Sequence, residues 1–371
     1  MKKILNSSNP YFQKSMNLYG RYEKYLPIAS FFAGFSWDSL TLSRIDQLFD
    51  NFTLLTYLLL LGGFIVLTNL IDKQIIKMPF WLKYREWYPL AIQFFLGGLF
   101  SAYVVFYFQS ADLSKNWMFL GLLVLLLVAN EFLKNRLTNL YFQMTLFFLA
   151  SFSFFIFFLP VITSTMNVWM FLLGGWLSLL LVGGILYLLY RFTAINSIEE
   201  LWRVCGLVLG IYLVLNLFYF NNWIPPIPLS LREGGIYHQV RRVEAQYQLK
   251  FEKPEWYEFF KDSDDEFHYV VGDSIFCFAS VFAPARLQTT LYHRWQQYQP
   301  AQEDWVTTDR IVYHITGGRG GGYRSYTFKR FIKSGEWRVR IETESEQLLG
   351  TLYFTVKEVP ARAYELVTIL R

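Results

Sequence analysis

The sequence contains only two cysteines among its 371 residues, which excludes a fold that depends on a framework of disulfide bonds. Cys205 lies at the end of an apolar segment, whereas Cys277 lies where polar and apolar residues alternate. We expect no disulfide between two regions of such different character. Each cysteine is expected to pack as a small apolar side chain.

Signatures of catalysis are also missing. The sequence has no Ser-His-Asp order, no nucleophile elbow and no paired-carboxylate spacing. The glycine run at 317–322 is not followed by the Gly-Lys-Ser/Thr of a phosphate-binding loop. We therefore predict no catalytic residue and no cofactor, and favour a protein that is not an enzyme.

Charge is scarce in the first part of the chain and balanced in the second. Up to Asn222 there are 15 Lys or Arg and 10 Asp or Glu; from Trp223 onward there are 19 of each. An electroneutral second part argues against nucleic acid as a partner. The change falls near the proline-rich stretch 223–228. The predicted parts are a cytoplasmic segment (1–24), a transmembrane helical domain (25–222), a linker (223–235) and an extracytoplasmic β-sandwich (236–371).

Long apolar runs fill the first part, and a helix needs about 20 mostly apolar residues to cross a bilayer. Six runs qualify, and a seventh at 25–42 is interrupted by Trp37 and Asp38. If the seventh also crosses, 13 basic residues before Asn222 share one side of the membrane and only Arg44 and Lys115 lie on the other. The positive-inside rule then predicts seven spans, a cytoplasmic N-terminus and an extracytoplasmic C-terminal domain in a bacterial inner membrane. The six stronger runs are 51–71, 88–109, 116–132, 140–161, 167–190 and 204–222.

Two acidic residues, Asp38 and Glu131, fall near the ends of predicted spans. Interfacial residues that are solvated by headgroups or water would explain both. The alternative is a polar role inside the membrane domain, in a transporter or an embedded enzyme that acts on a lipid-linked substrate. The two interpretations stay open at this point.

The second part has the period-two pattern of half-buried strands. Trp337, Val339 and Ile341 alternate with charged residues, and the segments 241–251 and 351–357 alternate in the same way. Further strands are expected at 268–282, 286–297, 305–316 and 323–332, with a helical turn or loop at 254–266. Seven or eight short strands predict an antiparallel, immunoglobulin-like β-sandwich.

Four ordered motifs in this region resemble a family known as domain of unknown function 2914. They are LYHRW at 291–295, GYRSY at 322–326, GEWRV at 335–339 and LGTLYFTV at 349–356. The apolar part, with GFSWD at 34–38, is similar to the multi-span region often joined to that domain in proteobacterial proteins. The resemblance implies an envelope location and supplies no activity, ligand or catalytic residue.

The histidines do not indicate a metal site. No two of the four have the spacing of a zinc motif, and His293 shares its face with Leu291 and Trp295, as a packed core histidine would. The acidic cluster at 262–266 lacks the features of a calcium loop and is interpreted as a solvated loop. We predict no metal ligand.

Basic and aromatic residues remain as candidates for binding. The glycine run at 317–322 is expected to be a flexible hairpin connection, beside basic residues that could face an anionic ligand. We predict a non-enzymatic membrane protein that presents this module to an envelope protein or an acidic glycan, with membrane lipids as its surroundings. The predicted binding residues are Arg319, Tyr323, Arg324, Tyr326, Arg330, Arg338 and Arg340.

Overall fold

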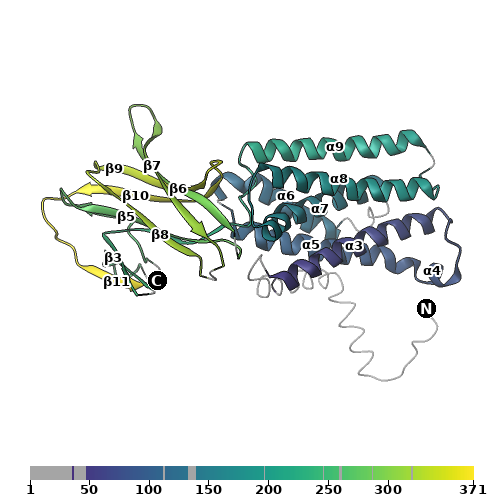
Figure 1. Ribbon diagram of the computed structural model, residues 1–371, viewed down its shortest axis with the longest axis horizontal. Helices are drawn as coiled ribbons and strands as arrows, with labels where there is room; N and C mark the ends of the chain where they lie inside the picture. Colours follow the sequence, from purple (N-terminus) through teal and green to yellow (C-terminus); the bar gives the residue numbers. More distant parts are fainter. Residues whose placement is uncertain are drawn as a thin grey trace, which may run out of the picture.

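The fold is that of a computed structural model in which a bundle of helices is followed by a region of β-sheets (Figure 1). The long axis of the molecule runs from the helices to the sheets. The residues that the structure describes are 36, 47–111, 113–132, 139–195, 197–244, 246–258, 261–285, 287–318 and 321–371.

Each of the six stronger predicted spans is a helix. Five of the described helices are long and apolar enough to cross a membrane, while the apolar stretch of α6, Asn116–Ala129, is shorter. The predicted span 25–42 lies almost entirely outside the described residues, so the number of seven stays a prediction. The helices are α3 (Leu48–Asp72), α4 (Pro79–Lys83), η1 (Arg85–Trp87), α5 (Tyr88–Gln109), α6 (Leu113–Phe132), α7 (Leu140–Thr163), α8 (Val168–Arg191) and α9 (Ile198–Phe220).

Capping side chains explain where several helices begin. The side chains of Asn139, Asn167 and Ser197 accept hydrogen bonds from backbone N–H groups in the first turns of α7, α8 and α9. Helix α9 therefore starts at Ile198, six residues before the predicted start at 204. The first turn of α9 is polar, so the helix begins before the apolar run begins.

The helices are apolar on both their inner and outer faces. Phe148 and Phe152 are fully buried in the core of the bundle, whereas Trp176 and Leu180 of α8 and Leu213 of α9 are largely exposed. A helix in water normally has a polar outer face, and a helix that is apolar all round belongs in a core or a membrane. The bundle thus has the surface that a lipid environment requires.

The described part of the C-terminal region contains eleven strands in three sheets, where seven or eight strands were predicted. Sheet A has the order β1-β5-β8, sheet B the order β11-β3-β2, and sheet C the order β4-β10-β9-β6-β7. Neighbouring strands are antiparallel except for the parallel pair β4 and β10. The strands are β1 (Ser230–Tyr237), β2 (Gln239–Val243), β3 (Gln246–Glu252), β4 (Glu266–Tyr269), β5 (Ser274–Phe282), β6 (Gln288–Gln299), β7 (Asp304–Thr316), β8 (Tyr323–Arg330), β9 (Gly335–Thr343), β10 (Leu348–Glu358) and β11 (Leu366–Leu370).

Two predicted strands are each divided by a turn. The prediction of one strand over 241–251 was wrong: Glu244 adopts a left-handed conformation (φ 54°), and β2 turns back on β3 as a hairpin. The segment 268–282 divides at Gly272 (φ 97°), which separates β4 from β5. The segment 254–266 contains turns and no helix among its described residues.

Sheet A is the middle layer, because both faces of its central strand β5 are buried. Ile275 and Cys277 pack in a core with Trp295 of sheet C, whereas Phe278 packs on the other side against Leu249 of sheet B. Alternation along a strand produces these two opposite cores. Cys277 is buried with a free thiol, and Cys205 is also a free cysteine.

His293 is confirmed as a packed core histidine. It is fully buried, and its Nδ1 lies 2.9 Å from Thr327 Oγ1, which also accepts a hydrogen bond from the Trp295 indole. Burial lowers the pKa of His293 to about 3. The core therefore holds a neutral imidazole.

The buried imidazole predicts a loss of stability in acid. Since the unfolded chain takes up this proton near pH 6.5 and the folded chain only near 3, the contribution of His293 is complete above pH 6.5 and is lost as the pH falls toward 3. Each pH unit in this window costs about 1.4 kcal/mol. Pulse proteolysis of the full chain in detergent, in urea series at neutral and mildly acidic pH, measures this slope. His293→Asn should reduce it, and equal slopes in both proteins would exclude His293 as the cause.

The sheets join the helices at one end of the bundle. Asn116 Nδ2 of α6 donates to the carbonyl oxygens of Asn222 (3.3 Å) and Trp223 (3.0 Å), just after α9. Ile224 and Ile227 of the connection belong to the apolar core of the helices. The opposite end of the bundle carries α4, with the basic segment 73–85 around it, far from the sheets (Figure 1).

Candidate functional site

A row of three arginines crosses the outer face of sheet C. Arg294 of β6 lies directly opposite Arg340 of β9 on one side and Arg310 of β7 on the other. The neighbouring residues Trp295 and Val339 point inward and are fully buried, so the arginines face away from the core. Like charges placed directly opposite on adjacent strands repel each other. We call Arg340, Arg294 and Arg310 the arginine row.

One buried carboxylate compensates much of this repulsion. Glu342 is fully buried, and its Oε1 lies 2.8 Å from Arg294 Nη2 and 3.2 Å from Arg310 Nε. Its Oε2 lies 3.9 Å from Arg340 Nη2. Burial lowers the pKa of Arg340, Glu342 raises it, and the nearby positive charge of Arg294 lowers it further. The row is thus only partly neutralised.

Aromatic rings extend the same face. The guanidinium of Arg338 lies 4.4 Å from the ring centroid of Trp305, which is 6.0 Å from the ring of Tyr353. The guanidinium of Arg310 lies 3.9 Å from the ring of Tyr292. With Arg338, four guanidiniums lie on this face, where the carboxylates of Glu342 and Glu346 pair with the arginine row. Such a face can take an anionic group and stack a ring beside it.

The structure does not bring the predicted binding residues together on one surface. Arg338 and Arg340 lie on β9 in sheet C, but Arg324 and Arg330 lie on β8 in sheet A. Thr327 of β8 points toward the core shared with sheet C, and the even-numbered positions of β8 alternate to the opposite face. A single patch that contains all four arginines was therefore a wrong prediction, because β8 and β9 do not pair.

The remaining predicted residues divide as follows. Tyr326 is exposed on the β8 face, whereas Tyr323 packs partly against the apolar core. Arg319 and Asp38 lie outside the described residues, and Glu131 lies in α6 with a side chain that is not described. The glycine run is not a hairpin connection, since β7 belongs to sheet C and β8 to sheet A.

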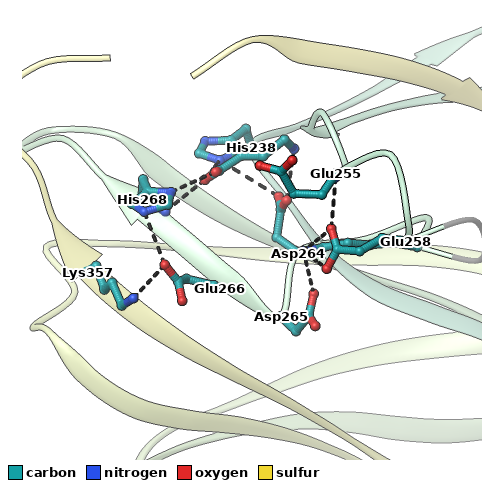
Figure 2. A network of polar contacts seen from close by, with 10 residues as sticks. His238, Glu255, Glu258, Asp264, Asp265, Glu266, His268 and Lys357 are labelled. Carbon is teal, nitrogen blue, oxygen red and sulfur yellow. Dashed lines mark hydrogen bonds and ion pairs between the residues drawn. The ribbon is translucent and has the colours of Figure 1, made fainter. Parts of the chain in front are cut away.

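A second polar site joins residues that are far apart in the sequence. His238 follows β1, Asp264 precedes β4 and His268 lies in β4 (Figure 2). Glu252 is the last residue of β3. His238 Nε2 lies 3.0 Å from Glu252 Oε1 and 3.8 Å from Asp264 Oδ2. Glu252 also accepts hydrogen bonds from the His268 backbone N–H (2.8 Å) and contacts His268 Nδ1 at 2.7 Å. We call His238, Glu252 and Asp264 the buried triad.

The two carboxyl groups of the buried triad differ in their pKa values. Burial alone would raise the pKa of Glu252, but hydrogen bonds from His238 and His268 outweigh it and lower this pKa to about 2. Burial raises the pKa of Asp264 to about 8, although the hydrogen bond from the Glu252 backbone N–H opposes the shift. Opposite shifts in neighbouring carboxyl groups are typical of sites that bind or react.

The triad corrects the prediction of a solvated acidic loop at 262–266. Asp264 is buried and its Oδ1 accepts a hydrogen bond from Glu252 N–H at 2.8 Å, although its neighbours Asp262 and Asp265 remain exposed. The separations of 14 residues between His238 and Glu252 and 12 between Glu252 and Asp264 match no metal motif. Pairing between strands brings the three together, and the sequence carries no local signal for it.

These features define a class of protein with several helices long enough to span a membrane, followed by an all-β region of mostly antiparallel sheets. Residues 288–356, from β6 to β10, match the family described as "Protein of unknown function (DUF2914)". The chain thus carries this domain in its C-terminal region, as the resemblance implied. The matched residues include the whole arginine row.

Comparisons with curated proteins and with solved structures add little to this match. No curated protein matches the chain. A β-glucosidase from Listeria innocua in complex with gluconolactone is 10% identical with a TM-score of 0.19. The match covers 33% of the present chain and 16% of the β-glucosidase chain. The Pseudomonas fluorescens alkylpurine DNA glycosylase AlkC, bound to DNA containing an abasic site analog, is 10% identical with a TM-score of 0.20. This match covers 76% of the present chain and 82% of the glycosylase chain. Neither similarity bears on the fold or function of this chain.

Proposed function

We propose that this protein is a non-enzymatic, membrane-anchored binding protein that holds an anionic polymer of the cell envelope on the outer face of sheet C. The arginine row supports the proposal, because three guanidiniums lie side by side on a rigid sheet with only partial compensation. A multivalent anion would replace the repulsion between them with charge-assisted hydrogen bonds.

The proposed arrangement places the helices in the inner membrane and the sheets in the periplasm. Its support is the separation between the sheets and the basic segment 73–85, which lie at opposite ends of the bundle. Under the positive-inside rule the basic end belongs in the cytoplasm. The seven spans and the immunoglobulin-like character of the sandwich formed by sheets A and C are parts of the same proposal.

An acidic glycan suits the face better than a protein partner. Trp305 and Tyr353 lie beside Arg338, so a sugar ring can stack on an aromatic side chain while its acidic group meets a guanidinium. An envelope protein remains the second candidate, since exposed aromatic and arginine side chains are also typical of protein interfaces. A transporter or a membrane-embedded enzyme would depend on Asp38 and Glu131.

Binding of dextran sulfate tests the proposal, with neutral dextran as the matched polymer. We expect the full chain in nanodiscs to bind the sulfated polymer, and Arg340→Gln to weaken binding about tenfold, as expected for one lost hydrogen bond to a charged group. Fluorescently labelled polymer and thermophoresis measure the affinity. High ionic strength should weaken binding further.

The control is the double variant Arg324→Gln and Arg330→Gln, which removes two charges from the β8 face. It should bind dextran sulfate as the unmodified protein does. If the control loses affinity as strongly as Arg340→Gln, or if neutral dextran binds equally well, sheet C is not a specific anion site.

A further inference from the structure

We propose that the buried triad of His238, Glu252 and Asp264 is a binding site for a divalent metal ion of the zinc type. The proposal is independent of the anion-binding face, which lies on β6, β7 and β9. It assigns one imidazole nitrogen and two carboxylate oxygens as ligands, with a fourth position left for water.

The separations between the ligand atoms suit a small metal ion. The three atoms lie within 4.8 Å of one another, and His238 Nε2 is 3.0 Å from Glu252 Oε1 and 3.8 Å from Asp264 Oδ2. Zinc bound at about 2.0–2.1 Å in tetrahedral geometry holds its ligand atoms about 3.4 Å apart. The side chains therefore need only small rotations to converge on one ion.

Asp264 supplies the observation that points most directly to a cation. No part of its side chain is exposed, and among the described residues its Oδ2 has no hydrogen-bond partner while Oδ1 accepts from Glu252 N–H. An unsatisfied buried carboxylate oxygen costs about 1–3 kcal/mol or more. This oxygen is aimed toward His238 (Figure 2), where a metal ion would satisfy it.

The surroundings hold the ligands in place. His268 contacts Glu252 through both its backbone N–H and its Nδ1, and the His238 ring stacks on Phe267 at a centroid distance of 3.9 Å. Partners of this kind orient metal ligands and tune their affinity. Calcium prefers six to eight oxygen ligands, so a set with one nitrogen and two carboxylates favours zinc over calcium.

The position of the triad indicates a structural role. Glu252 ends a strand of sheet B, and Asp264 precedes β4 at the edge of sheet C. The exposed fractions of the His238 and Glu252 side chains are 6% and 13%, which leaves little room for a substrate. A bound ion would tie sheet B to the edge of sheet C and stabilise the folded β region, more strongly the tighter it binds.

Metal binding to the full chain tests this site directly. The protein, purified without a histidine tag and stripped with a chelator, is titrated with Zn²⁺ and separately with Co²⁺. We expect one equivalent of Zn²⁺ to bind tightly and to raise the resistance of the β region to protease. Co²⁺ should produce the visible absorption bands of a four-coordinate nitrogen and oxygen site, a readout that needs no variant.

Asp264→Asn is the decisive variant, because its amide oxygen can still accept from Glu252 N–H while its NH₂ group replaces the ligand Oδ2. His268→Gln removes a partner that orients Glu252, and should weaken the affinity for Zn²⁺ by roughly 10–100-fold. Asp264→Asn removes a ligand and should weaken this affinity more. Asp262→Asn, which alters an exposed carboxylate of the same acidic run that pairs with Arg371, should bind normally. The proposal is overturned if Co²⁺ gives no bands with the unmodified protein, or if Asp262→Asn weakens Zn²⁺ binding as much as Asp264→Asn.

Discussion

Replacing Gly317 by alanine will destabilise the β region by about 3 kcal/mol or more, the upper range of overpacking in a rigid site. A Cβ at this position would lie only 1.8 Å from the carbonyl oxygen of Pro284 and 2.8 Å from that of Ala283. Both clashes involve backbone, which cannot rotate away as a side chain can. One chain segment or the other must move.

Backbone hydrogen bonds hold the two clashing chain segments together. Gly317 N–H donates to Leu287 O at 2.8 Å, and Gly318 N–H donates to Ala283 O at 3.1 Å. These bonds hold the end of β7 against the connection between β5 and β6. Separating the two segments would break the bonds as well as relieve the clash, so the cost includes both effects.

Gly321→Ala is the matched control within the same glycine run. Among the described residues, the atom near its Cβ position is the flexible Arg324 Nη2 at 3.6 Å, so we expect a change within about 0.5 kcal/mol. Pulse proteolysis of the full chain in a urea series compares the two variants. Equal and small effects would mean that the whole run is the flexible connection that its composition suggests.

The helices were predictable because their signal is local. An apolar run long enough to cross a bilayer is read directly from the sequence, and the six stronger runs are helices α3 and α5–α9. Their ends were less certain. The start of α9 depends on the capping side chain of Ser197, which precedes a polar turn that hydropathy assigns to a loop.

The strands were predictable as strands, but their partners were not. Alternation correctly turns Arg338 and Arg340 outward from a core that contains Val339. It cannot reveal that Arg294 and Arg310 lie beside Arg340, because that neighbourhood depends on the order and register of β9, β6 and β7. The same missing information led to grouping β8 with β9, although they belong to different sheets.

The buried triad lies beyond sequence patterns for a related reason. Asp264 stands in a run of acidic residues, and its neighbours Asp262 and Asp265 are exposed as such a run suggests. Its burial follows from the backbone hydrogen bond between Asp264 N–H and Ile236 O at 2.9 Å, a long-range contact with the end of β1. A single residue can therefore depart from the character of its segment when tertiary contacts fix its backbone.

Replacing Glu342 by glutamine is expected to destabilise the β region by about 3–5 kcal/mol, the usual cost of removing one partner from a buried ion pair. The Glu342 carboxylate is fully buried, and its Oε1 forms ion pairs with both Arg294 and Arg310. Glutamine keeps the shape of the side chain but not its charge, so the three arginines of the row would still repel one another. In the described contacts, the remaining negative charge beside them is that of Glu346. Urea midpoints from pulse proteolysis measure the loss.

Two comparisons separate this electrostatic effect from lost packing. Glu346→Gln removes a half-exposed partner of Arg294 and should cost only about 0–1 kcal/mol. Adding Arg340→Gln to Glu342→Gln should recover part of the stability, because it removes one of the like charges left in the row. If the double variant is as unstable as the sum of its single changes, repulsion within the row is not the cause.

The same variant links stability to the proposed binding of anions. A polymer that places its sulfate groups on the arginine row would supply the negative charge that Glu342→Gln lacks. Dextran sulfate should therefore stabilise Glu342→Gln more than it stabilises the unmodified protein, since at a given concentration a ligand that binds the folded state more tightly stabilises it more. An equal gain in both proteins would place the polymer elsewhere, whereas a larger gain in the variant means that ligand and carboxylate meet the same three guanidiniums.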